Sequence, residues 1–68
     1  MYKIKDGKHK EIKMLKKNRE IAEITGLNEG YISQILHGKR TDISKTAAFA
    51  ICKSISPELE ISDIFDIM

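Results

Sequence analysis

A chain of 68 residues has the size of a single domain, close to the lower limit at which an apolar core holds a fold without disulfides or metal. Hydrophobic residues make up 41% of it, which argues against a disordered chain, and its one cysteine excludes an internal disulfide. No apolar run approaches the roughly 20 residues of a membrane span. We therefore expect one domain over residues 1–68, with no metal, no cofactor and no membrane partner, in a reducing cytoplasm.

The net charge is only +2, but it is unevenly distributed along the chain. Ten Lys and Arg residues oppose five acids in residues 1–40, whereas two lysines oppose five acids in residues 41–68. This asymmetry would orient the molecule in the field of a polyanion with its basic end first. A solvated surface of mixed charge is the alternative.

Residues 1–7 alternate Tyr2 and Ile4 with two lysines. The alternation predicts a short, flexible, extended arm, and a frayed terminus is the alternative. Residues 8–17 place Ile12 and Leu15 on one face with Met14 beside them, which predicts a first helix whose lysines reach phosphates. We interpret His9 as a surface residue, because no second ligand follows at i+3 or i+4.

Residues 18–40 predict two short helices joined by a tight turn. Asn18 and Asn28 are each placed to cap a helix N-terminus. Gly26 ends the first helix and Gly38 the second, because glycine accepts the left-handed conformation. The inward apolar positions are Ile21, Ala22, Leu27, Ile32, Ile35 and Leu36.

The run IAEITGLNEGYISQILHGKR, from Ile21 to Arg40, resembles the helix-turn-helix of the phage repressor and Cro-like domains, because small, turn and apolar residues match in order. The resemblance implies an all-α fold, a compact bundle of about five short helices containing a helix-turn-helix. It also implies that the second helix of the motif enters the major groove of double-stranded DNA.

Site residues follow from the resemblance and from the outward positions counted from the second cap. Gln34 is the best candidate for base recognition, since its amide can pair bidentately with adenine. The ring of Tyr31 either packs on the bundle or offers its hydroxyl to a phosphate. The expected base-contacting or partner-facing residues are Glu29, Gly30, Ser33, Gln34 and His37. The expected phosphate-binding residues are Asn18, Arg19, Asn28, Lys39 and Arg40.

A further helix is predicted over residues 43–55, capped by Asp42 or Ser44 and ended by Ser56 with Pro57. Cys52 is interpreted as a small buried hydrophobe. The inner side is Ala47, Ala48, Ile51 and Ile55, flanked by Phe49 and Cys52. A last short helix, capped by Ser62, carries Ile61, Ile64, Phe65 and Ile67, which either close the core or form a surface for another subunit.

An enzyme is not expected, since so small a bundle leaves little room for a catalytic pocket. The first hypothesis is a sequence-specific regulator that binds a two-fold DNA operator as a homodimer, in the cytoplasm of a bacterial host cell. The second is a modulator or antirepressor that binds a partner phage repressor and blocks its DNA binding. Glu29 favours the second hypothesis, because a carboxylate is repelled by DNA but meets the basic residues of such a partner.

Overall fold

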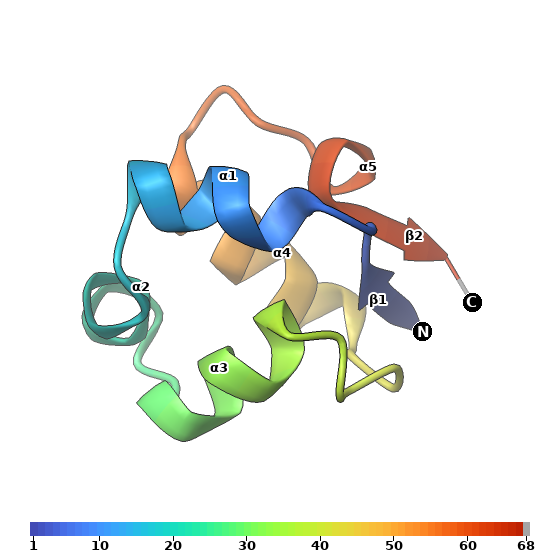
Figure 1. Ribbon diagram of the computed structural model, residues 1–68, viewed down its shortest axis with the longest axis horizontal. Coiled ribbons are helices and arrows are strands. Elements are labelled where there is room, and N and C mark those ends of the chain that lie inside the picture. The colour runs from blue at the N-terminus through green and yellow to red at the C-terminus, as the bar shows by residue number, and fades with distance from the viewer. Residues whose placement is uncertain (68) are drawn as a thin grey trace.

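The computed structural model describes residues 1–67, which form five helices and a two-stranded sheet (Figure 1). The helices are α1 (Lys8–Leu15), α2 (Asn18–Thr25), α3 (Glu29–Leu36), α4 (Lys45–Ile55) and α5 (Ile61–Ile64), and the strands are β1 (Tyr2–Ile4) and β2 (Phe65–Ile67). The expectation of a small, mostly helical bundle is thus correct in outline. The sheet was not predicted.

Helix α2 begins at Asn18, one residue earlier than predicted, because Asn18 was expected to be the N-cap and not the first helical residue. Asn18 is the first helical residue, and Lys17 is the N-cap. The backbone N–H of Lys17 donates to the Glu20 carboxylate at 3.4 Å, so a side chain inside the first turn satisfies this end. The prediction that Asn18 caps the helix is therefore wrong. Gly26, with φ of 76°, ends α2 as predicted.

Helix α3 begins as the sequence predicts. The side-chain oxygen of Asn28 accepts from the backbone N–H groups of Gly30, at 2.8 Å, and Tyr31, at 3.3 Å. These two amides would otherwise have no partner within the helix. After α3, Gly38 takes φ of 77° and turns the chain away. Both ends of the helix are thus fixed by local residues.

One continuous core joins all the helices to the sheet, and α4 contributes the most to it. Every helix supplies at least one buried aliphatic side chain, and full burial of each stabilises the fold by roughly 1.5–3 kcal/mol. The buried members are Ile4, Ile12, Ile21, Ile32, Ile35, Leu36, Ile43, Ala48, Ile51, Cys52, Ile55, Ile64 and Phe65. Cys52 is buried as predicted.

Helix α1 is shorter and less buried than expected. It ends at Leu15, after which Lys16 takes an extended conformation while its N–H donates to the carbonyl of Ile12. Ile12 is its one buried residue. Leu15 is 65% exposed and Met14 89% exposed, so the predicted inward position of Leu15 is wrong.

The N-terminal segment is a strand held on both sides. β1 pairs antiparallel with β2, with Tyr2 opposite Ile67 and Ile4 opposite Phe65. On its other side, the N–H of Tyr2 donates to the carbonyl of Ile43 at 2.9 Å, and Ile43 returns a bond at 3.2 Å. The extended conformation was predicted correctly. The segment is therefore a paired strand and not an unpaired arm or a frayed terminus, because backbone groups far along the sequence, in β2 and at Ile43, supply its hydrogen bonds.

Helix α4 begins at Lys45, two residues later than the predicted start at residue 43, and ends at Ile55 as predicted. The Ser44 hydroxyl accepts from the N–H of Ala47 at 3.2 Å, which settles the choice of cap, and Ser56 ends the helix before Pro57. Phe49, expected beside the core, is 51% exposed.

The last segment differs from its prediction. α5 is a single turn whose N-cap is Glu60, with the Glu60 N–H donating to the Asp63 carboxylate at 2.8 Å. Ser62 is therefore not the cap. Residues beyond this turn form a strand in place of a helix. Phe65 is buried and closes the core, as one of the two expected roles requires, whereas Ile67 is 77% exposed. The other expected role, a surface for another subunit, stays a prediction.

Candidate nucleic-acid interface

Helix α3 has one buried side and one open side. Ile32, Ile35 and Leu36 are buried, and they anchor the helix to the core. Helix α2 packs beside α3, and the chain passes between them in a three-residue turn, residues 26–28 (Figure 1). Half-buried Ala22 and Leu27 pack against the same core. The packing of its buried side against the core and α2 therefore fixes the position of α3 and leaves its other side open.

The side chains expected to face a macromolecule lie on this open side. Glu29, Gly30, Gln34 and His37 are exposed, and Ser33 is half-buried. The structure therefore brings the expected contact residues to one accessible face, although the helix itself carries no basic residue.

Gln34 does not stand alone on that face. The Arg40 Nε donates to the Gln34 side-chain carbonyl at 3.1 Å, and the guanidinium carbon lies 5.1 Å from the centroid of the Tyr31 ring. A guanidinium held over an aromatic face is attracted by the ring's negative π-face. This contact orients the Gln34 amide with its oxygen toward Arg40. Gln34, expected to contact bases, and Arg40, expected to bind phosphate, are thus in contact with each other. The ring of Tyr31 contacts Arg40 and packs against the core.

The unusual pair at the start of α3 has a local structural reason. A Cβ atom at Gly30 would lie 3.0 Å from the side-chain oxygen of Asn28, which is tighter than most contacts. Gly30 therefore leaves room for the cap. Glu29 lies in the first turn of α3, where a carboxylate is stabilised by the helix dipole. Both residues have a role in helix formation that is independent of any ligand.

The residues expected to bind phosphates are less equivalent than the sequence suggested. Asn18 is half-buried at the first position of α2. The Arg19 Nε lies 3.6 Å from the Glu23 carboxylate in an exposed pair, so its charge is partly offset. The side-chain oxygen of Asn28 is engaged in the cap. Lys39 is exposed just after α3 and is the least encumbered of the set. Arg40 is also exposed, but its guanidinium lies 4.0 Å from a carboxylate oxygen of Asp42.

A histidine pair escaped the sequence analysis. The rings of His9 and His37 lie with centroids 4.2 Å apart and planes tilted by 45°. Burial, followed by the charges of His37 and Lys13, lowers the pKa of His9 below its ordinary value. The two residues belong to different ends of the sequence, so no local spacing indicated the pair.

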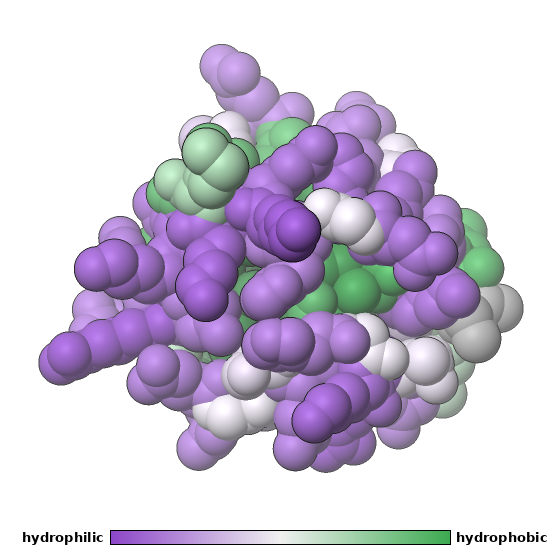
Figure 2. Space-filling model, in the orientation of Figure 1, coloured by the Kyte–Doolittle hydropathy of each residue, from purple (hydrophilic) through white to green (hydrophobic). Residues whose placement is uncertain are grey.

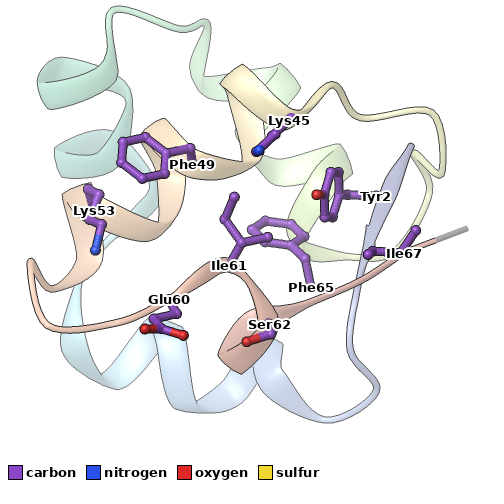
Figure 3. Close-up of a pocket in the computed structure, with 9 residues that line it drawn as sticks. All are labelled: Tyr2, Lys45, Phe49, Lys53, Glu60, Ile61, Ser62, Phe65 and Ile67. Carbon is purple, nitrogen blue, oxygen red and sulfur yellow. The ribbon is translucent and has the colours of Figure 1, made fainter.

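A groove of about 470 Å³ lies on another part of the surface, between α4, α5 and the sheet (Figure 3). Ile61 and Phe65 point toward α4 in its middle, and Phe49 stands on the opposite wall. Lys53 is held on that wall: its ammonium donates to the carbonyl of Leu59 at 2.7 Å and lies 5.5 Å from the Phe49 ring centroid. The lining residues are Tyr2, Lys45, Phe49, Lys53, Glu60, Ile61, Ser62, Phe65 and Ile67.

Within residues 1–67, no cluster of three or more His, Cys, Asp or Glu side chains is arranged to hold a metal ion. Across the same residues, none of the helices has the length and apolar character needed to cross a membrane. Comparison of the chain with protein-family models, with curated proteins and with solved structures gives no match. A functional proposal therefore depends on the fold, on the open face of α3 and on the sequence resemblance.

Proposed function

We propose that the chain is a small helix-turn-helix transcriptional regulator, similar to the phage repressor and Cro-like domains, that binds operator DNA with α3 in the major groove. The observation that carries the proposal is that α3 has one buried apolar side and one exposed polar side. Three of its aliphatic side chains are buried, and its opposite side presents a polar face next to Lys39 and Arg40. The major groove is about 12 Å wide and accepts an α-helix.

Specific roles follow from the contacts on that face. Gln34 contacts a base edge, and Arg40 holds its amide in one orientation. Lys39 and Arg40 follow the end of α3. Lys39 and the remaining N–H groups of Arg40 bind phosphates of the DNA backbone. Phosphate contacts position the protein, whereas the amide of Gln34 contributes sequence preference.

Dimerisation accompanies DNA binding in this proposal. One copy of so small a domain buries too little DNA surface for tight, selective binding, whereas two copies on half-sites about one helical turn apart add their contacts. The groove between α4 and α5 supplies a surface for the second copy, because Phe49 and Ile67 are large apolar side chains exposed at its edge.

A second candidate function is favoured by Glu29. Its exposed carboxylate at the start of α3 opposes a polyanion, but it would complement the basic DNA-binding face of another protein. In this alternative the chain is an antirepressor that occupies a partner repressor through the open face of α3. A purified protein that binds no duplex at 50 mM salt, yet forms a complex with a repressor from the same genome, would support the antirepressor and contradict the DNA-binding regulator.

The DNA-binding proposal is tested by the salt dependence of binding to a labelled duplex. Each phosphate contact is expected to lower log K by about 0.9 for every log unit of salt. Lys39→Ala should weaken binding to all duplexes alike and reduce that slope by about 0.9. Lys39→Arg is the matched control, because it keeps the charge. Equal slopes for the wild type and Lys39→Ala would remove Lys39 from the interface.

Sequence preference is tested separately with Gln34→Ala and a pool of random duplexes. The wild type should enrich a defined site, and the variant should lose preference at one base position, at a cost of roughly 1–3 kcal/mol. Gln34→Glu is a useful companion, because it keeps the size but can no longer donate to a purine N7. An unchanged preference in both variants would contradict the role of Gln34.

A further inference from the structure

A second cleft, of about 290 Å³, opens where β1, the start of α1 and the end of α3 meet. Figure 2 shows a recessed hydrophobic area surrounded by hydrophilic residues in this part of the surface. The floor is formed by the buried side chains of Ile4 and Leu36. The rim is polar and consists of Lys3, Lys5, Asp6, Gly7, His9, His37, Gly38 and Thr41.

Cations outnumber acids around the cleft. Lys3 and Lys5 are half-buried on the β1 side, and Asp6 is the one carboxylate of the rim. Lys5 also lies 3.9 Å from a carboxylate oxygen of Asp66 in β2, a half-exposed pair that an anion can compete with. With two lysines against one carboxylate on the rim, the cleft is positive by one charge when both imidazoles are neutral. It gains two more when both are protonated.

The histidines complete the rim. His37 places Nδ1 at 2.8 Å from the backbone carbonyl of Ser33. Because a carbonyl oxygen only accepts, this contact puts the proton of the neutral ring on Nδ1. The other nitrogen, Nε2, then becomes a donor only when the ring gains a second proton. The ring of His9, from α1, lies against this ring at a tilt of 45°.

Protonation of His9 is opposed in the free protein. His9 is half-buried, His37 lies against it, and Lys13 adds a further positive charge from the same helix as His9, which together lower the pKa of His9. Lys3 and Lys5 add to the positive charge from the strand side, and Asp6 opposes it. A bound anion would offset this repulsion, so binding of an anion and uptake of a proton favour each other.

We propose that this cleft binds a phosphate group, with Lys3, Lys5 and the paired imidazoles as its donors, and that protonation of the imidazoles strengthens the binding. The phosphate group can belong to a DNA backbone or to a free phosphate ion. The proposal does not depend on the function of α3, since it rests on a cleft formed by β1, α1 and the turn after α3.

The test follows the ring proton signals of His9 by NMR, because the chain contains only two histidines. Inorganic phosphate and sulfate are compared with chloride at equal ionic strength, so that general screening cancels. Sulfate keeps its charge from pH 5 to 8 and isolates the titration of the protein. Both anions should raise the pKa of His9 by about 0.5, which corresponds to about threefold tighter binding to the protonated form. An identical pKa in all three salts would overturn the proposal.

Two variants and a duplex complete the design. His37→Gln should reduce the response of His9 to sulfate at least about twofold, since one donor and one charge are lost. Lys45→Gln, which removes a lysine from the other groove, should respond as the wild type does. A His37→Gln response equal to that of the wild type would overturn the assigned donor set.

If duplex DNA at low salt also raises the pKa of His9, the phosphate is that of a nucleic-acid backbone. A response to the free ions alone assigns the cleft to free phosphate, even if α3 binds DNA elsewhere.

Discussion

The two asparagines of the α2 and α3 unit allow the start of a helix to be tested by a pair of matched substitutions. Asn28→Ala removes the oxygen that accepts from two backbone N–H groups, at 2.8 and 3.3 Å. Loss of such a cap costs about 1 kcal/mol, within a range of roughly 0.5–2 kcal/mol. Asn18→Ala removes a side chain that is not the cap of α2, so its expected cost is below about 0.5 kcal/mol.

The measurement is thermal and urea unfolding of both variants and the wild type, followed by circular dichroism. For a domain of this size, a loss of 1 kcal/mol lowers Tm by about 4–8 °C. Asn28→Asp should restore most of the loss, because a carboxylate oxygen also caps and suits the positive end of the helix. If Asn18→Ala destabilises the protein as much as Asn28→Ala does, or if Asn28→Ala leaves Tm unchanged, the assignment of the caps is wrong.

Four further outcomes are expected. Ile35→Ala should cost about 2–5 kcal/mol in urea unfolding because its side chain is fully buried, whereas Ile24→Ala, at a side chain 60% exposed, should cost below about 0.5 kcal/mol. The lowered pKa of His9 means that the unfolded chain binds more protons, so stability should fall as the pH drops below about 6.5, and His9→Gln should remove that part of the pH dependence. Burial raises the pKa of the Cys52 thiol, so a thiol reagent at pH 8 should modify the native protein many times more slowly than the protein in urea. If two copies pair through this groove as proposed, light scattering should find a dimer for the wild type and a monomer for Phe49→Asp, without loss of helicity. A dimer in both would exclude the groove as the dimer surface.

Local signals in the sequence were sufficient for most helix boundaries. Asn28, Ser44 and Gly26 act on backbone groups within four residues, so their roles can be inferred without the rest of the fold. The prediction for Asn18 was wrong for an equally local reason. Glu20 accepts from the Lys17 N–H, so the helix begins one residue earlier than a cap at Asn18 requires. A cap-type residue alone does not fix a boundary when a side chain in the first turn can satisfy the N–H of the residue before it.

The features that were missed depend on contacts between distant parts of the chain. Nothing near Ile4 reveals that Phe65 lies opposite it, so the N-terminal segment was predicted as an arm and the C-terminal one as a helix. The exposure of Leu15 depends on where α1 ends relative to the core. For the candidate site, the outward positions of α3 followed from its period, whereas the contact between Arg40 and Gln34 and the pairing of His9 with His37 required the fold.

The proposal that the open face of α3 meets DNA is tested most directly by Glu29→Gln in a duplex-binding titration at 50 mM and 150 mM salt. Removing a carboxylate from this face should tighten binding about two- to fivefold at low salt, with a smaller gain at high salt, because repulsion from the phosphates is screened. Circular dichroism checks that α3 remains folded. Unchanged or weaker DNA binding by a folded Glu29→Gln would contradict a DNA-facing α3, and weaker binding to a partner repressor would instead support the antirepressor.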